Sequence, residues 1–501
     1  MSSAKPGVAI IGSGIAGIAS AIRLAVQGFA VTVFEKNNYP GGKLTSLSKD
    51  GFHFDAGPSL FIQPSNIEEL FQLANEPLEP YFKYKPLPVA CKYFYEDGTI
   101  INAYADKIKF GQELQQKTGE QPVAIKTYLE ASEKIYRHIG SIFLNYSLHR
   151  FDSIKKANIL NALTHIRAKY LFQTLDQVNA GSFSNAHTVQ LFNRYATYSG
   201  SNPYKAPGML SLIPHLEYNE GVFYPEGGMI SITNALYQLA LKKGVKFYFN
   251  TAVDSIIYDK GKVKAVKTAK RETEAGIIIS NMDVYYTYKK LLGDDKTASK
   301  LLKQERSSSA LIFYWGINRE FSNLDLHNIF FSSNYKEEFE YLFTLKKIYA
   351  DPTIYINITA KCEAGIHAPP GKENWFVMIN VPANDGQDWN VLKQQARALI
   401  ISKLNRMLQT DLGDFIEVEE SLDPVSIDDK TSSYMGALYG TSSNSKNAAF
   451  LRHPNFSRTI KGLYFAGGSV HPGGGIPLCL KSAKIVSEII ETDQKKWKAH
   501  Q

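Results

Sequence analysis

The N-terminal segment changes from one hydrophobic periodicity to another. Val8–Ile11 is a short apolar run typical of a buried strand, and apolar residues recur at helical spacing from Ile15 to Gln27. Gly28 is expected to end this helix, and a second apolar run follows at Ala30–Phe34. The pattern predicts a strand, a helix and a second strand parallel to the first.

Residues 221–310 combine one helical stretch, Ser231–Lys242, with several apolar strand runs. The sequence DKGK at 259–262 separates two of these runs and predicts a hairpin turn. The stretch AGIIISNMD, which begins at Ala275, predicts a buried strand that ends in polar residues.

Two other regions differ in pattern. Residues 311–425 contain runs such as ALIFYWGI and NWFVMINV between turn signals, which predict a second sheet. Residues 111–220 are mostly helical in pattern, and 155–172 form a basic amphipathic stretch that would either lie in a membrane interface or pack on its own core. One face of that stretch carries Ile159, Leu163, Ile166 and Tyr170, with Lys155, Lys156, Arg167 and Lys169 around it.

Composition narrows the class of protein. At 501 residues the chain exceeds the roughly 250 to 300 that one hydrophobic core supports, so two or more domains are expected. The net charge of +8 is mild and no dense Lys/Arg block occurs, so we expect no nucleic-acid partner. No apolar run approaches the ~20 residues of a membrane span, no secretory signal is evident, and the three cysteines lie far apart. We therefore expect a cytoplasmic protein, peripheral to the inner membrane.

The first strand and helix enclose the dinucleotide-binding sequence GSGIAG. Gly12 permits the tight turn, Gly14 lets the backbone approach a pyrophosphate, and Gly17 allows close packing of helix on strand. The helix N-terminus, at Ile15 and Ala16, presents free N–H groups to phosphate. Glu35, beside Lys36 after the second strand, is placed to accept the ribose hydroxyls.

This fingerprint alone leaves NAD and FAD open. A second glycine pair, Gly41 and Gly42, follows the second strand and is succeeded by Lys43. A cation at this position suits a second contact to a dinucleotide held at its pyrophosphate, which favours FAD.

The chain resembles the FAD-dependent amine-oxidase-like superfamily and, within it, the bacterial-type phytoene and carotenoid desaturases. The resemblance is carried by GSGIAGIASAIRLA, EKNNYPGGKLTSL, GFHFDAGPSLF, GVFYPEGGMISITNAL and GLYFAGGSVHPGGGIPLCLKSAK. It implies an α/β and α+β fold with a discontinuous Rossmann-like FAD-binding domain, a mixed-sheet substrate domain and a helical, membrane-facing subdomain. The corresponding boundaries are 1–110, 221–310 and 426–501 for the FAD-binding domain, 311–425 for the substrate sheet, and 111–220 for the helical subdomain.

The resemblance also implies contacts that the fingerprint does not. The C-terminal segment is expected to fold back onto the flavin ring, where the start of a helix at Pro477 would point its dipole at the ring. The family commonly has Arg where this chain has Lys43, which keeps the charge but not the bidentate fork. The further residues expected to contact FAD are Gly57, Pro58, Ser59, Val253, Asn281, Gly467, Gly468, Gly475 and Ile476.

The implied reaction is desaturation of a carotenoid by hydride transfer to flavin N5. The resemblance favours the flavobacterial branch that desaturates the 3,4 bond of 1-hydroxylated carotenoids such as 1'-hydroxy-γ-carotene, with phytoene desaturase, carotenoid isomerase and retinol saturase as alternatives. No metal-ligand spacing is present, and a quinone or O2 is the expected electron acceptor. His471 is a candidate for the proton step, and Tyr224 and Trp315 are candidates for the tunnel lining.

Two other readings stay open on sequence. A lipid-binding escort protein of the GDP-dissociation-inhibitor type shares the fold without redox chemistry. An amine or protoporphyrinogen oxidase is a second enzyme class, in which covalent attachment of FAD to a cysteine, here Cys479, is a further alternative.

Overall fold

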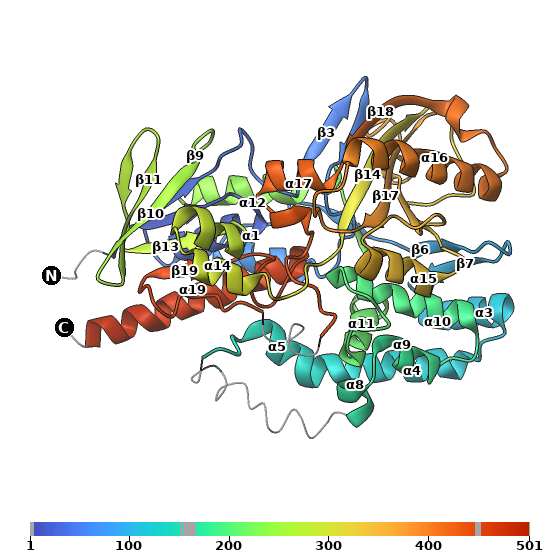
Figure 1. Cartoon of the computed structure of the whole chain (residues 1–501), viewed down its shortest axis with the longest axis horizontal. Coiled ribbons are helices and arrows are strands. Elements are labelled where there is room, and N and C mark those ends of the chain that lie inside the picture. The colour runs from blue at the N-terminus through green and yellow to red at the C-terminus, as the bar shows by residue number, and fades with distance from the viewer. Residues whose placement is uncertain (1–4, 151–152, 154–166, 446–451, 500–501) are drawn as a thin grey trace.

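Two sheets, one in each half of the molecule, organise the chain (Figure 1). The structure is a computed structural model that describes residues 5–150, 153, 167–445 and 452–499. The first sheet has the order β19-β13-β1-β2-β9, and every neighbouring pair in it is parallel. Its strands are β1 (Val8–Ile11), β2 (Val31–Phe34), β9 (Lys246–Tyr248), β13 (Ile277–Ser280) and β19 (Leu463–Phe465).

Both faces of this parallel sheet are covered, as its continuously apolar strands require. In β1, Val8 and Ile10 pack against one face's helices, α1 (Ile15–Val26), α12 (Ile230–Lys242) and α19 (Ile476–Ala499). Ala9 and Ile11 point to the other face, which packs against a small antiparallel sheet. That sheet consists of β10 (Val253–Asp259), β11 (Lys262–Thr268) and β12 (Glu272–Glu274).

The local predictions for this half are confirmed. The strand, helix and parallel strand at the N-terminus form as expected, and the buried strand after Ala275 is β13. The predicted hairpin joins β10 to β11 with Asp259 opposite Lys262. Its two central residues, Lys260 and Gly261, have positive φ angles of 47° and 70°, which is the backbone that a two-residue hairpin turn needs.

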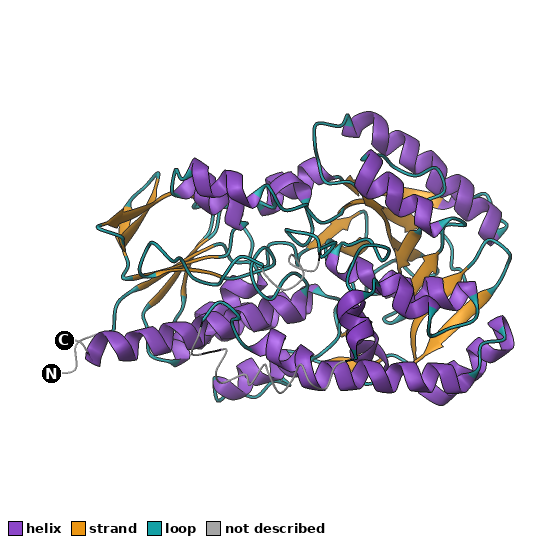
Figure 2. Cartoon of the chain, turned by 60° about the horizontal axis from the view of Figure 1, so that its bottom comes forward, coloured by secondary structure: helices purple, strands orange, loops and turns teal. Residues whose placement is uncertain are grey.

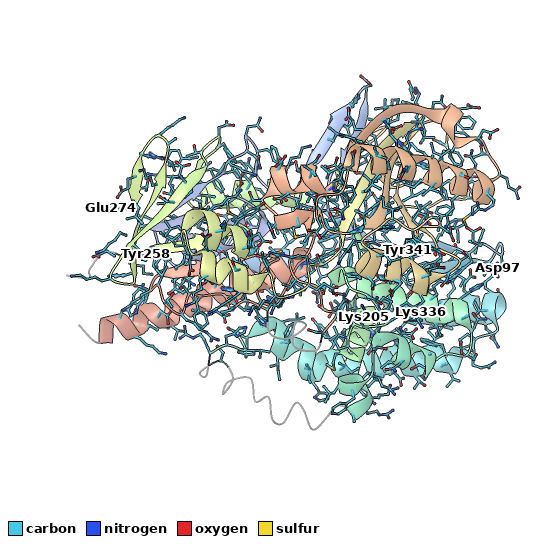
Figure 3. The ribbon with its side chains drawn as sticks, viewed as in Figure 1. Asp97, Lys205, Tyr258, Glu274, Lys336 and Tyr341 are labelled. Carbon is cyan, nitrogen blue, oxygen red and sulfur yellow. The ribbon has the colours of Figure 1, made fainter. Side chains whose placement is uncertain are left out.

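The second sheet has seven strands in the order β18-β14-β17-β16-β15-β6-β7. All neighbouring pairs are antiparallel except β15 with β6. The strands are β6 (Val89–Phe94), β7 (Ile100–Tyr104), β14 (Ser309–Ile317), β15 (His327–Phe330), β16 (Ile354–Asn357), β17 (Glu373–Val381) and β18 (Ile416–Leu422). Tyr258 on β10 and Asp97 in the β6–β7 turn mark opposite ends of the molecule (Figure 3).

This sheet requires one correction to the expected boundaries. Residues 1–110 were assigned to the FAD-binding domain, but β6 and β7 pair into the seven-stranded sheet. The reason is the long-range parallel pairing of β6 with β15, which no local pattern reveals.

The helix α16 (Trp389–Leu408), which the strand pattern of 311–425 did not predict, covers one face of the seven-stranded sheet. Ala396, Ile400 and Leu404 of this helix pack against Leu311 and Phe313 of β14. Figure 2 shows helices on both sides of these strands. Side chains on the face away from α16 line a cavity.

The region 111–220 is helical, as predicted, and packs beside β6 and β7 on an aromatic-rich core. The first helix, α3 (Lys107–Thr118), begins just before this region. The others are α4 (Pro122–Ile135), α5 (Ser141–Asn145), α8 (Ala168–Phe172), α9 (Leu175–Ala180), α10 (Ala186–Asn193) and α11 (Ile213–Tyr218). The predicted amphipathic stretch 155–172 lies outside the described residues up to Ile166. No helix within the described ranges has the length and apolar character to span a bilayer.

Shorter elements connect these parts. They are β3 (Ser46–Lys49), β4 (Phe52–Asp55), α2 (Ser65–Leu73), β5 (Tyr84–Pro86), β8 (Phe223–Pro225), α13 (Val284–Tyr286), α14 (Asp295–Leu301), α15 (Tyr335–Glu340) and α17 (Pro424–Thr431).

Candidate active site

A cavity of about 1060 Å³ is lined by residues of both sheets. Except for Gly17, every residue that the sequence predicted to contact the cofactor lies in its lining. These are Gly12, Gly14, Ile15, Ala16, Glu35, Lys36, Gly42, Lys43, Gly57, Pro58, Ser59, Val253, Asn281, Gly467, Gly468, Gly475, Ile476 and Pro477.

Glycines bring the carboxyl ends of three parallel strands together. A Cβ added at Gly17 would lie 2.3 Å from the carbonyl oxygen of Gly12, and one at Gly14 would lie 2.6 Å from Oδ1 of Asn281. Asn281 follows β13, and its Nδ2 donates to the carbonyl of Ala466 after β19 at 2.8 Å. Gly17 thus acts through packing, and the first turn of α1 is left facing the cavity with its backbone N–H groups.

Glu35 stands at the end of β2, where a ribose-binding acid belongs in this fold. Its Oε2 accepts hydrogen bonds from the backbone N–H and the hydroxyl of Ser13, at 2.7 and 2.8 Å. Its Oε1 accepts from the backbone N–H of Asn37 at 2.9 Å. Three donors therefore fix the carboxylate in the cavity wall. The neighbouring Lys36 donates to the hydroxyl of Ser432 at 3.0 Å, across the cavity rim.

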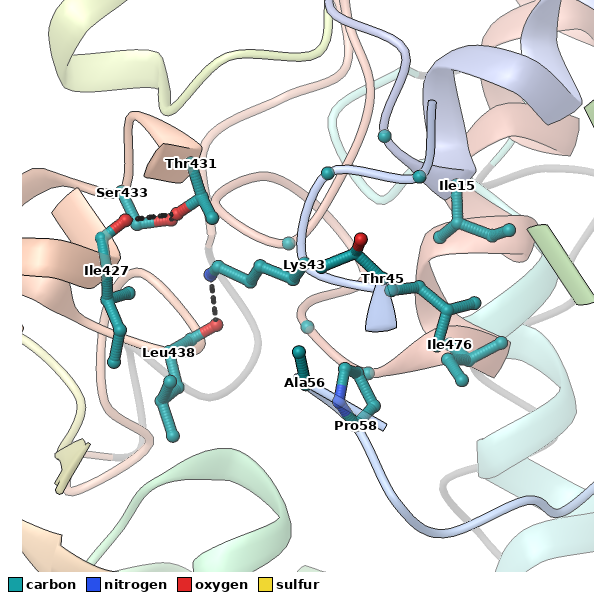
Figure 4. Close-up of a pocket in the computed structure, with 18 of the residues that line it drawn as sticks. Ile15, Lys43, Thr45, Ala56, Pro58, Ile427, Thr431, Ser433, Leu438 and Ile476 are labelled. Atoms are coloured by element: carbon teal, nitrogen blue, oxygen red, sulfur yellow. Dashed lines mark hydrogen bonds between the residues drawn. The ribbon is translucent and has the colours of Figure 1, made fainter. Parts of the chain in front are cut away.

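The second glycine pair packs directly on the first. A Cβ at Gly42 would lie 3.2 Å from the Cα of Gly14, and one at Gly57 would lie 1.8 Å from the carbonyl oxygen of Lys43. The amine of Lys43 donates to the carbonyl of Leu438 at 2.8 Å (Figure 4). Its burial lowers the pKa of the Lys43 ammonium. The segment therefore places a buried cation and close-packed backbone in the wall.

The C-terminal segment also lines the cavity, and Figure 4 shows Ile476 and Ile15 to the right of Lys43. The 24-residue helix α19 begins at Ile476, so its positive dipole end meets the cavity. Gly475 has a φ of 102°, and an added Cβ there would meet no atom of the described residues within 4 Å. Cys479 also lines the cavity, but burial raises the pKa of its thiol to about 11, which disfavours the thiolate that covalent attachment would need.

These features fit FAD. The N-termini of α1 and α19 face the cavity, and the fixed carboxylate of Glu35 stands at the ribose position. Glycine backbone lines the wall beside both helix N-termini, and this part of the wall is called the cofactor strip below. FAD bound there would place its pyrophosphate at the first turn of α1 and its flavin ring at the start of α19. Each helix N-terminus offers free N–H groups and a positive dipole end to these groups.

Part of the remaining cavity wall is the face of the seven-stranded sheet that points away from α16. Because side chains alternate along a strand, three alternate residues of β14 and three of β17 lie in this wall. These residues are Ala310, Ile312, Tyr314, Phe376, Met378 and Asn380. Such a wall suits a long apolar molecule.

The expectation that Trp315 lines the cavity is wrong. Trp315 shares the alternation of Leu311 and Phe313, so it points toward α16 and is fully buried there. The opposite alternation, Ala310 and Ile312, faces the cavity.

Tyr224 is also absent from the lining. It lies on β8, where its hydroxyl donates to Glu363 at 2.6 Å and contacts Nε2 of His367 at 2.8 Å. Because β8 pairs with β5 rather than with the seven-stranded sheet, this tyrosine supports the loop around Gly227, whose N–H bonds the same Glu363 at 2.8 Å.

His471, the candidate for the proton step, lies in the C-terminal segment but outside the cavity lining. Its Nε2 contacts the carbonyl oxygen of Tyr146 at 2.9 Å, and its ring meets Phe143 edge-on at 4.8 Å. Burial lowers the pKa of His471 to about 4. Its position indicates a structural contact between the loop and α5, and its catalytic role has no geometric support.

Sequence reasoning missed a polar group in the substrate end of the cavity. Arg194, Glu217, His327 and Tyr355 come from four separate segments and all line it. Their sequence neighbourhoods carry no motif, so only the fold brings them together.

The comparisons with known proteins agree with this site. The family of flavin containing amine oxidoreductases matches residues 15–490. A 1-hydroxycarotenoid 3,4-desaturase of Flavobacterium sp. (strain P99-3) is 51% identical over 481 residues, which cover 96% of this chain and 98% of the relative. A 4,4'-diaponeurosporene oxygenase of Staphylococcus aureus (strain MSSA476) is 34% identical and covers 98% of this chain and 99% of its own. An oxidoreductase from Methanosarcina mazei shares the fold at a TM-score of 0.63 and 16% identity, over 97% of this chain and 100% of that one.

The chain therefore belongs to the flavin-containing amine oxidoreductase family, a class of FAD-dependent oxidoreductases. Within that class it belongs with the carotenoid desaturases and oxygenases. The redox-inactive lipid-escort reading is thereby set aside.

Proposed function

We propose that this protein desaturates the 3,4 bond of a 1-hydroxylated carotenoid. The observation that carries the proposal is the 51% identity, over nearly the full length of both chains, to a relative named for that reaction. The apolar wall that β14 and β17 present supports it, because such a wall matches a long hydrocarbon substrate.

The reaction oxidises the substrate by two electrons. One C–H bond breaks at each of two neighbouring carbons, one C=C bond forms, and the hydrogens leave as a hydride and a proton. Bound FAD supplies the two-electron acceptor for the hydride. A quinone or O2 is proposed as the oxidant that later restores the cofactor.

The chain's own residues supply position and exclusion of water. Ile312, Phe376 and Met378 form an apolar part of the wall against which a rigid polyene would lie. Holding the reacting bond in register lowers the barrier through pre-organisation, worth up to about 7 to 11 kcal/mol in favourable cases.

Product analysis tests the proposal. Purified protein loaded with FAD would be incubated with 1'-hydroxy-γ-carotene or with phytoene in liposomes. A product two hydrogens lighter from the hydroxylated carotenoid alone supports 3,4-desaturation. Conversion of phytoene alone would move the protein to phytoene desaturation.

We also propose peripheral membrane association, because the substrate resides in the bilayer. The support is α8, where Phe172 has 73% of its side chain exposed beside the basic residues Arg167 and Lys169. An exposed aromatic residue with adjacent cations is typical of a surface that binds anionic lipid.

A further inference from the structure

One part of the cavity wall carries buried hydrogen-bonding groups. His327 is 3% exposed and Arg194 is 8% exposed, and both line the cavity. Within the described residues, neither Nε2 of His327 nor Nε of Arg194 has a hydrogen-bond partner. A buried polar atom without a partner costs about 1 to 3 kcal/mol, so two such atoms, both on residues that line one cavity, favour a ligand that carries a hydrogen-bonding group.

The hydrogen bonds of His327 determine which nitrogen carries the proton. Nδ1 accepts from Nδ2 of Asn357 at 3.3 Å and contacts the hydroxyl of Tyr355 at 2.8 Å. Burial and the nearby Arg194 cation lower the pKa of His327 to about 3, so the ring is neutral. A neutral ring whose Nδ1 accepts must carry its proton on Nε2. The unpartnered Nε2 is therefore a donor.

Arg194 is held beside this donor by several contacts. Its Nη2 donates to Oε2 of Glu217 at 3.3 Å, and its guanidinium lies over the ring of Tyr195 with 4.6 Å to the centroid. Glu217 is 3% exposed and also accepts from the hydroxyl of Tyr195. The ion pair is thus internally satisfied except for Nε, and it keeps this end of the cavity polar.

His327 lies close to the part of the wall that is predicted to contact FAD. Gly57 packs on the carbonyl of Lys43, and two residues later the hydroxyl of Ser59 contacts the hydroxyl of Tyr355 at 2.8 Å. That tyrosine hydroxyl is the one that contacts Nδ1 of His327. Two hydrogen bonds therefore connect Ser59, which is predicted to contact FAD, with the imidazole ring whose Nε2 is the unpartnered donor.

This proximity matches the proposed substrate. In a 1-hydroxylated carotenoid the hydroxyl-bearing carbon is separated from the 3,4 bond by a single carbon. A group that binds the hydroxyl must therefore lie beside the place where the 3,4 bond reacts. A donor remote from the cofactor strip would not meet this requirement.

We propose that Nε2–H of His327 donates to the hydroxyl oxygen of the substrate, with the Arg194 guanidinium as its second polar neighbour, and that His327 selects hydroxylated carotenoids. The inference rests on the proposed function and specifies its substrate recognition. A site built to hydrogen-bond a hydroxyl discriminates strongly against the analogue that lacks it, because its donors are then left unpaired.

The test compares His327→Leu with His327→Gln in the FAD-loaded protein. Each variant would be assayed for kcat/KM on 1'-hydroxy-γ-carotene and on γ-carotene, and for equilibrium binding of both by quenching of protein fluorescence. We expect His327→Leu to lose at least about tenfold on the hydroxylated carotenoid and to change less than about twofold on γ-carotene. His327→Gln keeps an N–H donor and is expected to recover most of the preference.

Ile329→Val, on the same strand and in the same wall, is the matched control and is expected to affect both carotenoids alike. Equal losses on both substrates in His327→Leu would overturn the proposal and leave His327 as a support for Tyr355. If the wild type converts neither carotenoid, the proposed function fails, and the binding titrations still decide the inference. Equal binding of both carotenoids by the wild type would overturn it.

Discussion

At the scale of single residues, the cofactor site depends on glycines, whose lack of a Cβ atom lets neighbouring groups approach closely. Gly14, Gly17 and Gly57 leave room that a methyl group would fill. The atom it would meet is Oδ1 of Asn281 at Gly14, the carbonyl oxygen of Gly12 at Gly17 and the carbonyl oxygen of Lys43 at Gly57. At Gly17 and Gly57 the atom belongs to the backbone, so no flexible side chain can move aside to make room for a methyl group. Close packing of this kind sets the shape of the cofactor strip.

Gly17→Ala is expected to lower flavin content sharply. Its Cβ would lie 2.3 Å from the carbonyl oxygen of Gly12, so the first turn of α1 must shift away from β1. The measurement is the ratio of flavin to protein absorbance after reconstitution with excess FAD. Gly413→Ala is the matched control, because its Cβ would meet no atom of the described residues within 4 Å. A full flavin complement in Gly17→Ala would contradict the proposal that the first turn of α1 binds FAD.

Asp55 makes stability depend on pH. Its Oδ1 accepts from the backbone N–H groups of Met229 and Ile230 before and at the start of α12, at 2.8 and 3.3 Å. Burial raises the pKa of Asp55 from 3.8 to about 6. Because the folded pKa lies above the unfolded one, the stability present below pH ~4 is lost as the pH rises through ~6, by about 3 kcal/mol in all.

We therefore expect Asp55→Asn to flatten this dependence, since the amide oxygen keeps an acceptor but does not ionise. Thermal unfolding measures this: between about pH 5 and about pH 7.5, the Tm of the wild type should fall more than that of the variant. Asp254→Asn, at an exposed position on β10, controls for the change in net charge. Parallel pH curves for Asp55→Asn and the wild type would refute the role of this carboxyl.

At the scale of elements, the alternation of β14 and β17 divides the molecule's chemistry from its packing. One set of side chains meets α16 and the other lines the cavity. Met378 is half-buried in the lined set, opposite Tyr355 on β16 and Ile312 on β14. A larger side chain there would occupy the space proposed for the polyene.

Met378→Trp is expected to reduce carotenoid conversion by at least about tenfold while the flavin spectrum stays unchanged, because misplacement of the reacting bond is costly. Met378→Leu conserves volume and should retain activity. Conversion rates and flavin spectra of both variants check this. Unimpaired conversion by Met378→Trp would show that the substrate lies elsewhere.

Sequence predicted the elements whose information is local. The turn at Gly12, the acid at Glu35 and the β10–β11 hairpin follow from short patterns, and the C-terminal helix start follows from Pro477. The pairing of β6 with β15 is long-range, so the boundary near residue 110 was wrong. The alternation that turns Trp315 toward α16 was visible in ALIFYWGI, but which of the two faces is lined by helix depends on α16, which the pattern did not reveal.

The substrate end was beyond sequence reasoning for a similar reason. Arg194 belongs to a 3-10 helix, Glu217 to α11 and His327 to β15, and each is ordinary in its own segment. Their common feature is burial beside one cavity, which only the assembled fold shows.

At the scale of the whole molecule, charge and exposure bear on where the protein works. The net charge is +8, and α8 places Phe172 on the surface. Tyr258, 45% exposed on β10, lies in the other half of the molecule (Figure 3). The two residues allow the same change to be made on two different surfaces.

Phe172→Glu is expected to weaken binding to anionic vesicles by about tenfold, because burial of a Phe side chain contributes about 1.5 to 3 kcal/mol. Flotation with vesicles rich in anionic lipid measures this. Tyr258→Glu adds the same charge away from α8 and should leave binding nearly unchanged. Equal weakening by both variants would show that vesicle binding depends on net charge and would contradict a specific contact at α8.

We propose that a flavin bound in this cavity oxidises a hydroxylated carotenoid. The most direct measurement is anaerobic mixing of the FAD-loaded protein with 1'-hydroxy-γ-carotene in liposomes, with the visible spectra of flavin and carotenoid followed together. We expect the flavin band to bleach as the carotenoid band shifts to the red, in equal molar amounts. A flavin band that stays unchanged while the carotenoid is demonstrably bound would contradict it.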